Sequence, residues 1–436
     1  MPQHSKSPLV ERRYLPAFIL ITSLFALWGF ANDITNPMVA AFQTLMEISA
    51  SKASLVQFAF YGGYATMAIP AALFIRRYSY KSCILLGLAL YAVGAFLFIP
   101  AAHQESFAFF CVSLYVLTFG LAFLETTANP FILSLGSKST STRRLNLAQA
   151  FNPVGSLSGM AVASLLVLPN LISDTRDAAG QIIYPTLSAA EKAQIRVHDL
   201  AVIRDPYVAL GLVVLVMFVV IALVRMPNPA REKVDDRHPT ARETLRRLWS
   251  NRIYVFGVIS QMFYVAAQIM VWTFIIHYAD NLGIPKATAQ NYNILAMSLA
   301  LCGRFCGTFL MKYVRPPVML ASFGIGAVCC TLGAIFMVGM AGLWSLVFIS
   351  LFMSIMFPSI YGIALDRVSP ADTSLGSAFL VMAIVGGALM PPVQGAVIDM
   401  GTVAGLPAVN ASYALPLFCF IVVTAYGLTT ARLTRR

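Results

Sequence analysis

Charged side chains are scarce in this 436-residue chain: Asp, Glu, Lys and Arg make up only 11% of it, whereas 58% of the residues are hydrophobic. A soluble domain usually carries about 25% charged residues. So few ionised side chains cannot cover a globular protein of this length with a polar shell, and lipid must cover the rest. The composition therefore excludes a soluble protein and indicates a membrane protein.

Signatures of catalysis and of nucleotide or metal binding are missing as well. The sequence contains no Gly-Lys-Ser/Thr phosphate-binding loop, no HExxH and no GxSxG, and it has only five histidines. Its seven cysteines all fall in apolar stretches, without the spacing of a disulfide framework or a zinc site. We therefore expect neither an enzyme nor a bound cofactor or metal.

Basic residues are in excess, with a net charge of +12, but their positions argue against a nucleic-acid partner. They gather in short clusters between long apolar runs, as in Arg76, Arg77 and Lys81, rather than in a soluble basic domain. Such clusters are typical of the cytoplasmic loops of membrane proteins.

Twelve apolar stretches are long enough to cross a bilayer, which requires about 20 residues. The sequence therefore predicts an all-α polytopic membrane protein with twelve transmembrane helices. Their approximate ranges are 16–44, 54–75, 82–101, 107–135, 145–168, 207–225, 252–279, 288–312, 317–339, 343–365, 374–399 and 411–430.

The distribution of basic residues predicts the orientation. With the N-terminus inside, the short external connections contain only Lys52 and Lys286, and the long external connection 169–206 carries little topological information. The first apolar run is too long for a signal peptide and lacks a small-residue cleavage site, so we interpret it as the first span. We expect a monomeric, multi-pass protein of a bacterial inner membrane, surrounded by lipid, with both termini in the cytoplasm.

A charged segment with several prolines divides the chain in two. Residues 226–251 have the composition of a cytoplasmic linker, so we expect six helices in residues 1–225 and six in residues 252–436. A small-residue helix, a basic turn and a new apolar run follow in the same order in both parts. Duplicated halves of a transporter would explain this similarity, although glycines and basic turns are common in any membrane protein.

Three charged residues fall inside the predicted spans: Asp33, Glu125 and Arg304. A charge there costs at least about 2.5 to 3.5 kcal/mol, so these side chains must face the protein interior or a water-filled cavity. A carboxyl group held out of water is more readily neutral, so it can take up a proton on one side of a membrane and release it on the other. Glu125 and Asp33 are therefore candidates for proton coupling; the alternative is a structural partnership, for example with Arg304.

Other polar residues in the spans also have two interpretations. Arg304 either bridges neighbouring helices or gates a cavity. Asn129 precedes Pro130 and Asn36 precedes Pro37. Such pairs interrupt the helices that line transport cavities, but proline is also common in ordinary membrane helices.

Two polar stripes suggest a ligand site. Asn146, Gln149 and Asn152 are spaced i, i+3, i+6, and Tyr264, Gln268 and Trp272 are spaced i, i+4, i+8, so each set lies near one helix face. Amides offer both donors and acceptors to sugar hydroxyl groups, and an aromatic face can stack on a sugar ring. The alternative is hydrogen bonding and packing between helices.

The motifs "LETTANPF", "RLNLAQAFN" and "FALWGFAND" together make the chain similar to the fucose permease branch of the major facilitator superfamily. The likeness covers nearly the whole chain, including "YVAAQ" and "GRFCGT". It implies two six-helix bundles, alternating access, and symport of a monosaccharide with protons. It also implies a protonatable glutamate at Glu125.

The resemblance implies an aspartate in the first helix too, but that position aligns with Asn36. Asp33 lies three residues earlier, on nearly the same face, and could take its place. Relatives with the "NDITNP" form include glucose and galactose transporters, so fucose is one candidate among several monosaccharides. The residues expected to bind the sugar are Asn36, Gln149, Asn152, Tyr264, Gln268 and Trp272.

The sequence is also compatible with two other functions. One is an uncoupled facilitator, or an exporter of another small metabolite, on the same fold. The other is a membrane sugar sensor, which would bind a sugar without moving it.

Overall fold

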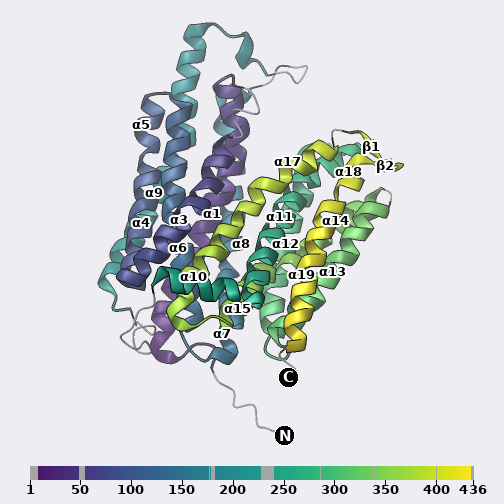
Figure 1. Cartoon of the computed structure of the whole chain (residues 1–436). Coiled ribbons are helices and arrows are strands. Elements are labelled where there is room, and N and C mark those ends of the chain that lie inside the picture. Colours follow the sequence, from purple (N-terminus) through teal and green to yellow (C-terminus); the bar gives the residue numbers. More distant parts are fainter. Residues whose placement is uncertain are drawn as a thin grey trace.

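The structure, a computed structural model, describes residues 8–48, 55–175, 177, 182–226, 240–284, 286–337, 339–398 and 400–433. Twelve helical segments of this described part are long and apolar enough to cross a membrane, which confirms the predicted number. The segments of the first half stand on one side of the molecule and those of the second half on the other (Figure 1).

The first half contributes six spans, some of which are interrupted. They consist of α1 (Leu15–Leu45), α3 (Leu55–Arg77), α4 (Tyr80–Phe96) with α5 (Phe98–His103), α6 (Phe107–Ser134), α7 (Ser141–Gln149) with α8 (Phe151–Val162), and α9 (Ala189–Leu223). Short 3-10 turns precede α1 (Arg12–Tyr14) and α7 (Lys138–Thr140), and a π-helical turn (Ala163–Val167) with further short turns follows α8.

The second half contributes the other six spans. They consist of α11 (Arg252–Asn281), α12 (Lys286–Leu310), α13 (Pro316–Phe336), α14 (Met340–Met353) with α15 (Met356–Asp366), α16 (Thr373–Met382) with α17 (Gly386–Ile398), and α18 (Ala408–Ser412) with α19 (Ala414–Leu433). A two-stranded antiparallel hairpin, β1 (Thr402–Val403) and β2 (Leu406–Pro407), joins the last two spans.

The sixth span is longer than the sequence predicts. Residues 189–206 were assigned to an external connection, but they continue α9, which projects well beyond its neighbours (Figure 1). Ser188 and Glu191 start this helix with a capping box: the Ser188 Oγ accepts from the Glu191 N–H (3.4 Å), and the Ser188 N–H donates to the Glu191 carboxylate (3.0 Å). Helix α9 therefore has a polar N-terminal part, which begins at its own cap and precedes the apolar run that the sequence predicts.

The linker contains a short helix, α10 (Ala241–Ser250), which the sequence did not predict; residues 227–239 of the linker lie outside the described part. The Arg247 guanidinium donates to both carboxylate oxygens of Asp372 at 2.8 and 2.7 Å, which attaches α10 to the second half. The backbone N–H of Thr240 donates to the Glu243 carboxylate (2.9 Å) and holds the pKa of Glu243 below its usual value.

Two glycines allow α1 and α8 to touch through their backbones. A Cβ at Gly29 would lie 2.0 Å from the Asn152 carbonyl oxygen, and one at Gly155 would lie 1.8 Å from the Ala26 carbonyl oxygen. Only glycine permits this approach, as at many contacts between membrane helices. The close crossing sets the position of Asn152 relative to α1.

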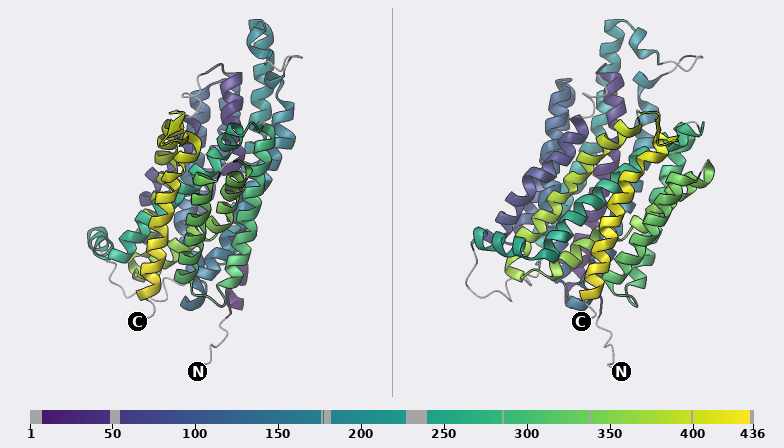
Figure 2. Two further views of the ribbon diagram at one scale, coloured as in Figure 1. Left: turned by 90° about the vertical axis from the view of Figure 1, so that its right-hand side faces the viewer. Right: turned by 45° about the vertical axis from the view of Figure 1, so that its right-hand side comes forward.

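The two halves meet near the side of the molecule where α1 begins and α19 ends, which we call the termini side (Figure 2). The polar contacts across the halves there include Arg143 Nε to Thr308 O (3.1 Å), Asn146 Nδ2 to Ser359 Oγ (3.3 Å), Ser377 Oγ to Thr126 O (2.7 Å) and the ion pair Lys138–Asp366 (3.4 Å). The halves diverge toward the opposite side (Figure 1). Any space between them is therefore closed at the termini side.

Candidate functional site

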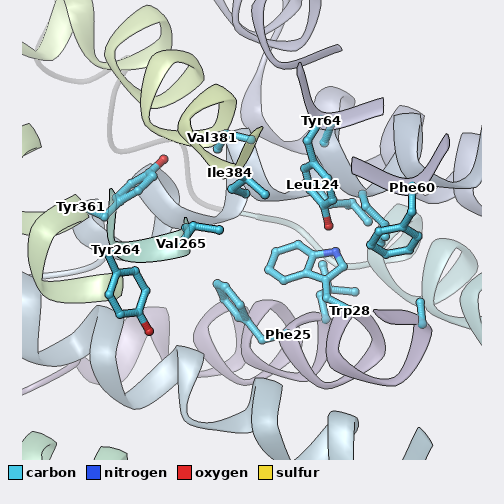
Figure 3. Close-up of a cluster of buried hydrophobic side chains, with 14 of the residues drawn as sticks. Phe25, Trp28, Phe60, Tyr64, Leu124, Tyr264, Val265, Tyr361, Val381 and Ile384 are labelled. Atoms are coloured by element: carbon cyan, nitrogen blue, oxygen red, sulfur yellow. The ribbon is translucent and has the colours of Figure 1, made fainter. Parts of the chain in front are cut away.

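A cavity lies between the two halves. Helices α1, α3, α6, α7 and α8 line it from the first half, and α11, α12, α14, α15 and the turn at Ile384 line it from the second. Buried aromatic side chains of the two halves lie near one another, Trp28 and Tyr64 from the first half and Tyr264 and Tyr361 from the second (Figure 3). Of these, Trp28, Tyr64 and Tyr264 line the cavity.

Most of the residues that the sequence singled out meet in this one cavity. Its lining includes Asp33, Glu125, Gln149, Asn152, Tyr264, Gln268, Trp272 and Arg304. Asn129 lies directly behind the wall, fully buried. The side chain of Asn36 lies outside the described part of the structure.

Two acidic side chains stand on neighbouring helices of the first half. Glu125, on α6, is partly exposed to the cavity, whereas Asp33, on α1, is 5% exposed. Tyr61 and Tyr64, one turn apart on α3, line the same cavity. Both acids thus lie on the wall that the first half contributes to the cavity.

Amide side chains connect that wall to α7 and α8. The Asn129 Nδ2 donates to the backbone carbonyl of Glu125 (3.0 Å), and its Oδ1 accepts from Gln149 Nε2 (2.8 Å). The Asn152 Nδ2 donates to the carbonyl of Phe25 on α1 (3.2 Å). These bonds orient Gln149 and Asn152 at the cavity surface and link them to the helices that carry the acids.

The opposite wall is built by α11. Tyr264 is fully buried, and its hydroxyl donates to the Met353 carbonyl (3.1 Å). The Trp272 Nε1 donates to Ser350 Oγ (3.2 Å), which fixes the ring at the cavity. Gln268 stands between these two aromatic residues on the same helix face. Such a wall can hydrogen-bond a hydroxyl group and cover an apolar ring face.

Arg304 joins the halves at the base of the cavity. Its Nε donates to the carbonyl of Ser354 (2.5 Å), and its Nη1 donates across the halves to the carbonyl of Gln149 (2.8 Å). Gln149 is the last residue of α7 and Ser354 follows the last residue of α14, so the guanidinium satisfies carbonyl groups at two helix ends. This geometry fits both a structural bridge and a gate.

Several residues that line the cavity were not predicted from the sequence. Trp28 and Asn32 on α1 and Tyr61 and Tyr64 on α3 also face the cavity. The Trp28 Nε1 is buried and has no hydrogen-bond partner among the described residues, so it can donate to a ligand. The spacing of Trp28 and Asn32 at i, i+4 matches the stripes that were recognised.

A polar cavity between two six-helix halves, sealed on one side only, is the architecture of an alternating-access secondary transporter. The model of the Major Facilitator Superfamily matches residues 19–392. The chain belongs to this superfamily, as its motifs predicted. The structure is similar to the crystal structure of a Major Facilitator Superfamily transporter, FucP, in the outward conformation: the TM-score is 0.87 with 33% identity, covering 96% of this chain and 99% of that one.

Curated relatives are similar along the whole chain. The L-fucose-proton symporter of Haemophilus influenzae is 61% identical over 96% of this chain and 97% of its own length. The glucose/galactose transporter of Brucella abortus is 30% identical over 98% of this chain and 97% of its own length.

Proposed function

We propose that this protein is a symporter that carries a monosaccharide, in the first place L-fucose, across a membrane together with a proton. The observation that carries the proposal is the single cavity between the halves, in which two carboxyl groups meet amide and aromatic side chains from both walls. The similarity to the Haemophilus influenzae L-fucose-proton symporter favours L-fucose. Glucose or galactose is the second candidate, because the Brucella abortus relative also covers nearly the whole chain.

Glu125 is the group that takes up and releases the coupling proton. It is exposed enough to exchange a proton with water in the cavity and lies on a helix that is otherwise buried around it. Asp33 assists it in place of the first-helix aspartate, and Tyr61 and Tyr64 stand beside the two acids. Neutralising an acid by protonation lowers the cost of closing the cavity around it, which couples the proton to the movement of the halves.

The sugar is held between the two walls. Gln149 and Asn152 bind hydroxyl groups from one side, Gln268 and Tyr264 bind from the other, and Trp272 covers the ring face. Asn36 is proposed as a further ligand from α1. Because ligands come from both halves, binding draws the halves together and promotes the switch between conformations.

Arg304 and Asn129 take part in the conformational change of the two halves and do not bind the sugar directly. The Arg304 bond to the Gln149 carbonyl closes the termini side and must break when that side opens. Asn129 holds Gln149 at a fixed distance from the Glu125 backbone during the conformational change, through its hydrogen bonds to both. The sealed termini side and the divergence of the halves on the other side correspond to an outward-facing state.

The orientation follows from the charge distribution. We place both termini in the cytoplasm of a bacterium and the protein in its inner membrane, as a monomer surrounded by lipid. The halves comprise residues 1–225 and 252–436, joined by the linker 226–251. The basic clusters near the termini side support this orientation.

The test is transport by the purified protein in proteoliposomes. L-Fucose, D-glucose and D-galactose are supplied in turn, with and without an imposed inward proton gradient. We expect flux of L-fucose and accumulation only with the gradient. Binding without flux would show a sensor, flux without accumulation would show a facilitator, and preference for glucose or galactose would reassign the sugar.

A further inference from the structure

Three backbone carbonyls near the cavity accept hydrogen bonds from side chains, and each belongs to the fourth residue before a proline. They are the carbonyls of Thr126, Gln149 and Ser354, which precede Pro130, Pro153 and Pro358. In a helix, the carbonyl of residue i accepts from the N–H of residue i+4, and proline has no N–H. The prolines therefore leave these carbonyls without the usual helical partner.

The side chains that donate to these carbonyls all belong to the second half. Arg304, on α12, donates to the Gln149 carbonyl (2.8 Å) and to the Ser354 carbonyl (2.5 Å). Ser377, on α16, donates its hydroxyl to the Thr126 carbonyl (2.7 Å). The bonds to Gln149 and Thr126 cross between the halves, so they exist only while the halves are in contact at the termini side.

The Thr126 carbonyl is the clearest case, because it lies inside a continuous helix. Helix α6 ends at Ser134, about two turns beyond Thr126. A helix leaves only its last four carbonyls free, as at Thr308 in the last turn of α12, to which Arg143 donates. Without Pro130, the Thr126 carbonyl would therefore accept a hydrogen bond within α6.

A second hydroxyl group orients Ser377. The Tyr361 hydroxyl, on α15, is hydrogen-bonded to Ser377 Oγ. Serine has one hydroxyl hydrogen, which Ser377 donates to the Thr126 carbonyl, so Tyr361 is the donor in this bond. Thr126, Tyr361 and Ser377 are all fully buried. Removing the Ser377 hydroxyl would thus leave a buried acceptor without a partner, which is unfavourable.

We propose that Pro130 and Ser377 form a second seal of the termini side, beside the bond from Arg304 to Gln149, in which the proline of one half frees the acceptor for the hydroxyl of the other. The inference rests on the proposed transport function. Thr126 directly follows Glu125, so this seal ends on the helix turn that carries the proposed proton-binding residue. When the termini side opens, water between the halves replaces Ser377 at the freed carbonyl. The seal is therefore stable while the contact is dry and costs little to break once water enters.

The test uses purified protein that carries Thr142→Cys as a reporter for opening of the termini side. Thr142, on α7, is buried against Gly362 of the second half, so a thiol there reacts only when the halves separate. A maleimide is added in detergent, and the labelled peptide is identified by its mass, which distinguishes the reporter from the native cysteines. We expect Ser377→Ala to raise the labelling rate of the reporter at least about fivefold.

Ser113→Ala is the matched control. It removes an equally buried hydroxyl, which donates to the Phe109 carbonyl within α6 and does not cross between the halves. The reporter should be labelled within about twofold of its rate in the otherwise unchanged protein. An equal rise in Ser113→Ala and Ser377→Ala would show a general loosening of the helices and would overturn the inference.

Pro130→Ala tests the part that the proline plays. Alanine restores an N–H at position 130, so the Thr126 carbonyl gains a partner within α6 and no longer depends on Ser377. In this background we expect Ser377→Ala to change the labelling rate by less than about twofold. An unchanged rate in Ser377→Ala alone, or the same rise with and without Pro130, would also refute the second seal. Labelling does not require transport, so absence of sugar flux in the wild type would refute the proposed function separately.

Discussion

The two walls of the cavity differ in chemistry although both come from six-helix halves. Among the described lining residues, both carboxyl groups, Asp33 and Glu125, belong to the first half, whereas the guanidinium of Arg304 and the Tyr264 to Trp272 stripe belong to the second. Amides occur on both walls. From this difference we propose different roles for the two halves. The first half binds the proton, and both halves bind the sugar. The second half supplies Arg304, whose bond to the Gln149 carbonyl, here called the lock, closes the termini side.

The most severe test of this division is Glu125→Gln, which keeps the shape of the side chain but cannot ionise. For one proton per sugar, a gradient of one pH unit corresponds to about 1.4 kcal/mol, or about tenfold accumulation. We expect accumulation to fall to a ratio of about one. Sugar counterflow, which does not require proton release, should stay within several-fold of wild type; both are measured with labelled sugar in proteoliposomes.

Asp33→Asn is the matched comparison on the neighbouring helix. A partial loss of accumulation is expected, since Asp33 is more buried than Glu125 and is proposed to assist it. Full accumulation by Glu125→Gln would show that the coupling proton does not bind at Glu125.

Arg304→Met is expected to have the next largest effect, on conformation rather than on coupling. It leaves the carbonyls of Ser354 and Gln149 without the bonds that Arg304 donates, and a buried unsatisfied group costs about 1 to 3 kcal/mol. We expect a transport rate at least about tenfold lower and a lower melting temperature in detergent. Arg304→Lys should be intermediate, because an ammonium lacks the planar fork. Unchanged melting and transport in both variants would show that the lock lies elsewhere.

Substitution on the α11 wall should weaken sugar binding and leave coupling intact. Gln268→Leu removes a donor and an acceptor, so we expect affinity to fall about tenfold, or about 1.4 kcal/mol. Accumulation at saturating sugar should remain. The measurement is sugar binding to the purified protein, with Gln149→Leu as the corresponding change in the first half. A loss of coupling in Gln268→Leu would contradict the assignment of proton coupling to the first half alone.

The smallest effect is expected at α10, which lines neither wall. Arg247→Met removes the two bonds to Asp372, whose side chain is only 3% exposed, but Ser369 Oγ still donates to that carboxylate (2.7 Å) and keeps it partnered. Transport should stay within about twofold of wild type, measured in the same proteoliposomes. A large loss would show that the attachment of α10 to the second half takes part in the cycle.

The sequence predicted the spans well because lipid imposes a length and an apolar composition on each of them. The prediction failed for helical segments that polar interactions stabilise. The polar start of α9 is held by the Ser188 capping box, and α10 by the Arg247 pair with Asp372, so neither has an apolar signature.

The sequence predicted those residues of the site that are unusual in a membrane span. Asp33, Glu125 and Arg304 stand out because charge is costly in a membrane, and the amide stripes stand out by their spacing. Tyr61 and Trp28 were missed because aromatic residues are frequent in every span. The partners of Arg304 are backbone carbonyls of two distant helices, which no side-chain pattern reveals.

The central claim is that sugar and proton move together, and it can be measured directly in the wild-type protein. Proteoliposomes are suspended in an unbuffered medium, L-fucose is added outside, and external pH is recorded while sugar uptake is followed. The account predicts that the external pH rises in step with uptake, because each sugar carries a proton inward. Uptake of L-fucose at constant external pH would contradict it.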